Sequence, residues 1–295
     1  MNPNDYLAVI LDVQSIKDGD AELKAIESAR EKVESIMKKQ YGSKITVKYG
    51  GSKAKGTMIK DNYDLDILCY FENGDNSAGN NLEEIYNDVA KTLEKEYHIE
   101  KKNSAIRIWD KKGSEDFHID VVPGRFDEDK KDAFLHQNDS PKARLKTNPE
   151  KHIKYIQDSG RRDVIKLAKI WREQKGINLK TFVLELLVIE ILKTSSDREV
   201  YDKLLVTLFK ELSNNIDSIK IEDPANPTGN DLSTIFNDEM KNIIKKYAKQ
   251  ALDVVRAGKW ENIFGPTERM NPDEVVKNIQ IIKSKNPNPS KPYLV

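Results

Sequence analysis

The sequence predicts an α+β protein: a mixed sheet with helices, introduced by a long N-terminal helix, followed by a helical domain. Apolar residues recur every three or four positions over 21–39, which is the period of an amphipathic helix. They alternate with polar residues in short stretches between residues 45 and 122, and beyond about residue 145 the helical period replaces the strand signals. We therefore expect domains at 1–145 and 146–284 and a flexible, proline-containing tail at 285–295.

The first domain is expected to alternate strands, loops and one further helix. A strand over 45–49 ends at Gly50-Gly51, and a second strand covers 65–71. The polar stretch 72–81 is a loop, and the helical period returns over 82–93. A hairpin follows, and its parts are two arms, 105–109 and 117–122, around a turn at 111–116.

Composition excludes several classes of protein. The chain has 295 residues, of which 38% are hydrophobic and 33% charged, so it is long enough for two cores and too polar for a membrane protein. Its single cysteine, Cys69, excludes an internal disulfide framework and the usual zinc patterns. The N-terminus lacks the pattern of a secretory signal, so we expect a cytoplasmic protein.

The balance of 49 basic and 49 acidic residues hides a strong segregation of charge. Residues 61–90 contain eight acidic residues and no Lys or Arg, whereas residues 140–180 contain twelve basic and four acidic ones. Solvated surface explains most charge runs. The same segregation suits a site that holds divalent cations on one wall and polyphosphate on the other.

Three aspartates on predicted strands carry the chemical signal. Side chains alternate along a strand, so Asp64 and Asp66 project from one face while Leu65 and Ile67 project from the other. Asp120 lies between two apolar residues of the hairpin. Such carboxylates suit Mg²⁺ or Mn²⁺, and two ions held this way stabilise the attacking and leaving oxygens of a phosphoryl displacement.

Gly51 and Ser52 directly follow the first strand, where small residues, hydroxyls and exposed backbone N–H groups can bind phosphate. Taken alone, this segment is weak evidence, because glycines between a strand and a helix usually form only a turn. Its order and spacing relative to the three aspartates favour the functional interpretation.

Gly51-Ser52, Asp64-x-Asp66 and the apolar-flanked Asp120 together resemble the nucleotidyltransferase superfamily typified by DNA polymerase beta. The stretches 161–187 and 222–230 resemble the helical domain of oligoadenylate synthases and of the bacterial cGAS/DncV-like nucleotidyltransferases, which make cyclic di- or trinucleotide signals in antiphage defence. The resemblance covers about residues 20–270. It implies a polymerase-beta-like catalytic domain and an active site in the cleft between the two domains.

The resemblance also implies roles for individual residues. Asp64 and Asp66 would hold two Mg²⁺ or Mn²⁺ ions, and Asp120 would help to hold the ion that activates the acceptor hydroxyl. Gly51 and Ser52 would grip the β- and γ-phosphates of a nucleoside triphosphate. Lys169 matches the lysine of the relatives that reaches the triphosphate, and the sequence places it on a basic stripe with Arg162 and Lys166.

Other positions have two interpretations. Thr181 and Phe182 stand where relatives have a serine and an aromatic residue that stacks on the base, but they are also consistent with the start of a buried helix, and Phe182 lacks a phenol. Asp223 and Asn226 shape either a base pocket or a loop between helices. Glu185, within an apolar helix, is expected to be a paired structural acid.

The leading functional hypothesis is a template-independent enzyme that joins nucleoside triphosphates, ATP among them, into a cyclic di- or trinucleotide second messenger. The alternatives are a synthase of linear oligonucleotides, a nucleotidyltransferase that acts on tRNA, protein or a small molecule, and an inactive nucleotide-sensing module. Zero net charge disfavours a long nucleic-acid partner. The family resemblance implies a downstream effector for the product, and a protein activator or conjugation at the tail is compatible with it.

Overall fold

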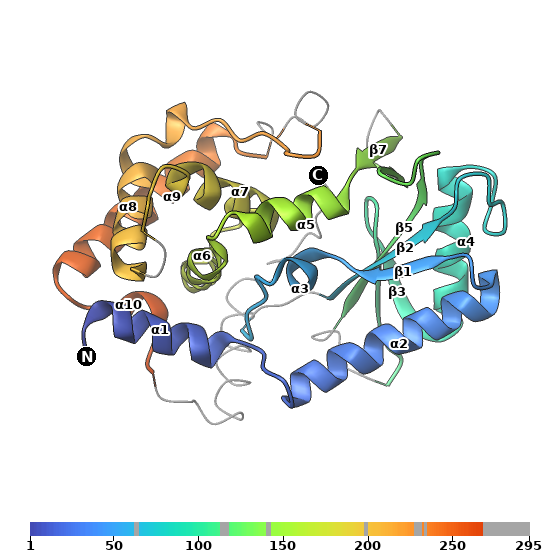
Figure 1. Ribbon diagram of the computed structural model, residues 1–295, viewed down its shortest axis with the longest axis horizontal. Coiled ribbons are helices and arrows are strands. Elements are labelled where there is room, and N and C mark those ends of the chain that lie inside the picture. Colours follow the sequence, from blue (N-terminus) through green and yellow to red (C-terminus); the bar gives the residue numbers. More distant parts are fainter. Residues whose placement is uncertain are drawn as a thin grey trace.

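The computed structural model describes residues 1–61, 65–112, 118–139, 143–197, 200–226, 232 and 235–267. Within them a mixed sheet with its covering helices is followed by a helical region, as the sequence predicts. Figure 1 shows the sheet beside α2 and α4, with α6 to α10 gathered at the other end of the molecule. The predicted tail 285–295 lies outside the described residues.

The sheet is built around the parallel pairing of β2 with β5. The strands are ordered β1-β2-β5-β4-β3, and β6 and β7 extend the sheet beyond the far end of β5. Their bounds are Thr46–Tyr49 for β1, Leu65–Phe71 for β2, Tyr97–Lys101 for β3, Ile106–Asp110 for β4, Ile119–Phe126 for β5, Ala133–His136 for β6 and Arg144–Thr147 for β7. The expected hairpin is present as β4 and β5, whereas β3, β6 and β7 were not predicted.

One face of the sheet is covered by α2 (Ala21–Tyr41) and α4 (Leu82–Glu94). The odd-numbered residues of β2, among them Leu65, Ile67 and Cys69, are buried against these helices. The even-numbered residues therefore project from the opposite face, where Leu68 and Tyr70 belong to a smaller apolar cluster. Asp66 shares this second face, as the alternation along the strand predicts.

The helical region has its own core, to which the first helix of the chain contributes. Leu7, Ile10 and Leu11 of α1 (Pro3–Gln14) pack in one cluster with α6, α7, α8 and α9, and Tyr6 donates a hydrogen bond to the carbonyl of Gly265. Figure 1 shows α1 beside α10. The helices are α5 Pro149–Asp158, α6 Arg162–Gln174, α7 Thr181–Leu192, α8 Tyr201–Asn214, η1 Ile216–Ser218, α9 Asp238–Arg256 and α10 Glu261–Phe264.

The short helix α3 (Gly51–Lys55) lies between the sheet and the helical region (Figure 1). It packs on β2 and on α5, and Gln157 of α5 donates a hydrogen bond to the carbonyl of Ala54. Helix α3 is therefore the element that both parts of the molecule share. In the described part of the chain, no helix has the length and apolar character needed to cross a bilayer.

Because Leu7 is fully buried in the helical core, Leu7→Ala is expected to lower the free energy of unfolding by about 2–5 kcal/mol. Asp12→Ala, on the same helix, removes an exposed ion pair with Lys17 and is expected to cost less than about 1 kcal/mol. Urea unfolding of both variants measures the difference. Equal costs would contradict the assignment of α1 to this core.

Candidate active site at the junction of sheet and helices

Two of the three predicted carboxylates are brought side by side by the strand pairing. In the parallel register of β2 and β5, Asp66 lies directly opposite Asp120. Both project from the face that α2 and α4 leave uncovered, because their neighbours in sequence are buried against those helices. Asp120 is almost fully buried, whereas Asp66 is partly exposed. Asp64 lies outside the described residues.

The Gly50-Gly51 turn packs directly on Asp66. The backbone N–H of Gly50 donates a 2.9 Å hydrogen bond to the carbonyl of Asp66. A Cβ atom on Gly51 would lie 1.6 Å from Asp66 Oδ2, and Gly51 has a φ of +49°. Only glycine meets both conditions at this position. The first turn of α3, which contains Ser52, is therefore held against the carboxylate of Asp66.

Asp120 has a partner that the sequence analysis missed. Arg107 on β4 donates two hydrogen bonds to its carboxylate, from Nε to Oδ1 and from Nη2 to Oδ2, both of 2.9 Å, and both side chains are buried. This bidentate geometry fixes the orientation of the carboxylate. The sequence contained the information needed to find this pair. A hairpin centred on the turn 111–116 pairs residue 107 with residue 120, which is the register in the structure.

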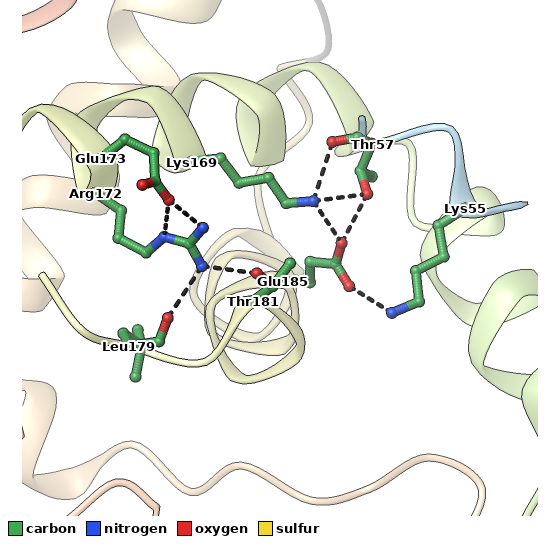
Figure 2. A network of polar contacts seen from close by, with 8 residues as sticks. All are labelled: Lys55, Thr57, Lys169, Arg172, Glu173, Leu179, Thr181 and Glu185. Carbon is green, nitrogen blue, oxygen red and sulfur yellow. Dashed lines mark hydrogen bonds and ion pairs between the residues drawn. The ribbon is translucent and has the colours of Figure 1, made fainter. Parts of the chain in front are cut away.

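Lys169 lies in a buried polar network instead of on an open basic stripe. Its ammonium contacts Glu185 Oε1 at 3.0 Å, the Thr57 carbonyl at 3.0 Å and Thr57 Oγ1 at 3.1 Å, so its three donors each have an acceptor. Only 3% of Lys169 is exposed. Figure 2 shows Lys169 and Lys55 approaching Glu185 from opposite sides. Glu185 is thus a paired structural acid, as the sequence suggests.

The network holds more positive than negative charge. Burial lowers the pKa of Lys169 to about 8, although the Glu185 carboxylate opposes this. Burial disfavours ionisation of Glu185 as well, but Lys55 and Lys169 outweigh it and lower the pKa of Glu185 to about 2. Both directions follow from one carboxylate placed between two ammonium groups. The carboxylate stays ionised, while the positive charges are only partly compensated.

Thr181 and Phe182 begin α7 beside this network. Thr181 Oγ1 accepts a 2.8 Å hydrogen bond from Arg172 Nη1, which also donates to the carbonyl of Leu179 (Figure 2). Phe182 is 7% exposed, and its ring centroid is 4.6 Å from Lys55 Nζ and 4.7 Å from the centroid of the His152 ring. Phe182 therefore packs in the interior of the junction.

Asp223 and Asn226 belong to the loop after η1. Asp223 is fully buried, and its Oδ1 lies 2.6 Å from His152 Nε2 and accepts a 2.8 Å hydrogen bond from the backbone of Ala225. The backbone N–H of Asn226 donates to the carbonyl of Asp223. His152 contacts both Asp223 and Phe182, so this loop joins the same junction. Residues 227–230, the remainder of the stretch 222–230, lie outside the described residues.

The site residues thus form two groups connected by α3. The carboxylate group contains Asp66, Asp120 and Arg107 on the sheet, and Gly51 and Ser52 at the start of α3. The junction group contains Lys55, Thr57, Lys169, Glu185, Phe182, His152 and Asp223. Paired carboxylates beside a glycine turn, with Lys55 on the same short helix and Lys169 on α6, suit the transfer of a nucleotidyl group.

This architecture is that of nucleotidyltransferases with a mixed sheet and a helical domain. Residues 1–159 match the family model described as Second Messenger Oligonucleotide or Dinucleotide Synthetase domain, so the chain belongs to this family. It is a nucleotidyltransferase of the cyclic oligonucleotide synthase class.

Relatives of known structure and activity agree with this assignment. The cyclic AMP-AMP-AMP synthase of Escherichia coli strain MS 115-1 is 23% identical over 259 residues, covering 75% of this chain and 77% of the relative. The structure of CdnC from E. coli MS115-1 with ATP has a TM-score of 0.70 at 19% identity and covers 90% of this chain and 98% of CdnC. CdnG of Bradyrhizobium diazoefficiens, solved with GTP, has a TM-score of 0.71 at 14% identity, covering 95% and 98%.

Glu185→Gln is expected to lower the free energy of unfolding at pH 7 by about 3–5 kcal/mol, because it leaves two lysines without their buried counter-charge. The folded pKa of about 2 lies below the ordinary value of 4.5. Ionised Glu185 therefore stabilises the fold fully above about pH 4.5, and this contribution disappears as the pH falls toward 2. The cost of Glu185→Gln, measured by urea unfolding, is expected to shrink over that interval.

Glu190→Gln is the matched control, because Glu190 is on the same helix but forms an exposed pair with Lys193. Its cost is expected to stay below about 1 kcal/mol. If the two variants had equal stability at pH 7, the energetic importance of the buried network would be refuted.

Proposed function

We propose that this enzyme condenses nucleoside triphosphates, with release of pyrophosphate, into a cyclic di- or trinucleotide second messenger, and that Asp64, Asp66 and Asp120 are its catalytic carboxylates. The observation that carries the proposal is the register of β2 and β5, which sets Asp66 opposite Asp120 while Gly51 packs on Asp66. A reacting phosphate bound at the start of α3 would lie next to both carboxylates.

The carboxylates fit a divalent cation. Asp66 and Asp120 offer hard oxygen donors on one face of the sheet, which Mg²⁺ and Mn²⁺ prefer. No group of three potential ligands occurs among the residues the structure describes, and Asp64, which would complete the set, is not among them. When bound, two such ions would neutralise the charge that develops on the attacking and leaving oxygens.

The chain itself would orient the reactants. Asp120, held by Arg107, would face the acceptor hydroxyl and would receive its proton as that oxygen attacks the α-phosphorus. Ser52 and the backbone N–H groups at the start of α3 would hold the β- and γ-phosphates that depart as pyrophosphate. Lys169 would contribute positive charge from behind α3.

The junction group would shape the nucleotide base site. Helix α7 starts with Thr181 and Phe182, and the Phe182 ring lies next to Lys55. His152 contacts both Phe182 and Asp223, so the loop that contains Asp223 and Asn226 adjoins the start of α7. Because Phe182 is buried and contacts His152 and Lys55, we propose that it supports the base pocket from within. Because phenylalanine has no hydroxyl group, Phe182 cannot make the hydroxyl contact to the base that a tyrosine could make.

The product would act as a signal in antiphage defence and would be read by a downstream effector. A related synthase, CdnC of E. coli MS115-1, has been solved in complex with a HORMA protein, which supports a protein activator for this chain as well. ATP and GTP in the structures of relatives support both nucleotides as candidate substrates here. A role of the tail 285–295 in conjugation stays a prediction, because the tail lies outside the described residues.

Purified protein incubated with ATP, GTP, CTP and UTP labelled at the α-phosphate, together with Mg²⁺ or Mn²⁺, is expected to give oligonucleotides whose chromatographic mobility phosphatase does not change, because a ring has no terminal phosphate. Asp66→Asn and Asp120→Asn are expected to reduce the product at least 100-fold, since each removes a proposed metal ligand. Chromatography of the products measures both outcomes.

Products whose chromatographic mobility changes because phosphatase removes 5′-terminal phosphates would indicate linear chains instead. No product with either metal, with or without a HORMA-type partner, would contradict the proposed activity. Undiminished activity of a folded Asp66→Asn or Asp120→Asn variant would overturn the assignment of the carboxylates.

Gly51→Ala is expected to reduce turnover about 100-fold, because its methyl group would displace the carboxylate of Asp66. Gly42→Ala is the matched control: Gly42 also has a positive φ, +80°, but no atom within 4 Å of the added Cβ. Both variants are expected to lose about 1 kcal/mol of stability or more from backbone strain. Pyrophosphate release at equal folded concentration compares them, and equal activity would contradict the role of this contact.

A further inference from the structure

Glu185 is a fully buried carboxylate that ties α3 to the helical region. Its Oε2 lies 2.8 Å from Lys55 Nζ, its Oε1 accepts a 2.7 Å hydrogen bond from Thr57 Oγ1, and the same Oε1 lies 3.0 Å from Lys169 Nζ. Lys55 is the last residue of α3, Thr57 follows two residues later, and Lys169 belongs to α6 (Figure 2). One carboxylate of α7 therefore joins three elements.

The two lysines are held differently. Lys169 has all three donors directed at Glu185 and Thr57. Lys55 has Glu185 as its single hydrogen-bond acceptor among the described residues, and its ammonium otherwise lies over the Phe182 ring. Lys169 thus connects α6 to Thr57 through buried hydrogen bonds, and Lys55 connects the C-terminal end of α3 to Glu185.

Helix α3 is consequently fixed at both ends. At its N-terminal end Gly51 packs on the Asp66 carboxylate and Gly50 bonds to the Asp66 carbonyl. At its C-terminal end Lys55 and Thr57 are bound to Glu185. The helix has only five residues, so a displacement at one end is transmitted to the other.

We propose that Glu185 is a positioning residue of the active site: by holding Lys55 and Thr57 it sets the place of Ser52 relative to Asp66. This inference rests on the proposed function, because it concerns the same phosphate-binding turn. Glu185 lies on α7 and would touch no substrate. Through Lys55 and Thr57 it would help to align the triphosphate with the carboxylates. A displacement of about 1 Å at such a turn is enough to cost a large factor in rate.

Two variants separate positioning from stability. Glu185→Asp keeps the negative charge that compensates the lysines, but its side chain is one methylene shorter and cannot reach Lys55 and Thr57 at the same distances. Glu185→Gln keeps the length and removes the charge. Glu190→Gln, on the exposed side of the same helix, is the control. Each is compared with the wild type at a temperature well below its midpoint of thermal unfolding.

The expected result is a rise in KM for ATP of about tenfold or more in both Glu185 variants, with kcat/KM reduced about 10- to 100-fold, and values within twofold of wild type for Glu190→Gln. Amide hydrogen exchange over residues 51–57 is expected to be faster in the Glu185 variants. A merely structural Glu185 would lower the unfolding midpoint and leave KM of the folded enzyme unchanged, and that result would overturn the inference.

The two proposals fail in different ways. If the wild type makes no nucleotide product, the proposed function fails, whereas the exchange rates of residues 51–57 still report on the anchoring of α3. If the wild type is active and both Glu185 variants keep its KM and its exchange pattern, the proposed function stands and the positioning role is refuted.

Discussion

The buried carboxylate of Glu185 is the interaction on which the joining of the sheet to the helices depends. An ionised group without solvent is costly, and it persists here because two ammonium groups and one hydroxyl surround it. A hydrophobic residue in its place would pack without constraint on direction. The carboxylate instead requires that α3, α6 and α7 meet in one arrangement, so the network exchanges stability for a defined geometry.

Helix α3 connects this junction to the proposed active site. Its first residue is a glycine because the Asp66 carboxylate occupies the space of a side chain. Its last residue, Lys55, and Thr57 just after the helix both bind Glu185. The same short segment therefore contacts the proposed catalytic wall and the helical region. Because α3 is held at both ends, the turn at its start can align a flexible triphosphate.

The buried charges of the site also differ on the two sides of α3. The carboxylate of Asp120 is compensated by Arg107, whereas Glu185 is shared by two lysines. An excess of positive charge thus lies behind α3, and the exposed part of the negative charge lies in front of it at Asp66.

Sequence alone was sufficient for the fold class, the hairpin and the face of β2 that carries Asp66, because these follow from local periodicity. It also indicated Glu185 as a paired acid, since an ionisable residue in an apolar helix needs a counter-charge. It missed β3, β6 and β7, whose runs of four or five residues are too short for a clear pattern. It placed Lys169 on a basic stripe because helical spacing reports a face but not what packs on it. Lys169 meets Thr57, 112 residues away in the chain, and Asp223 meets His152, 71 residues away, and only the tertiary structure decided those two pairings.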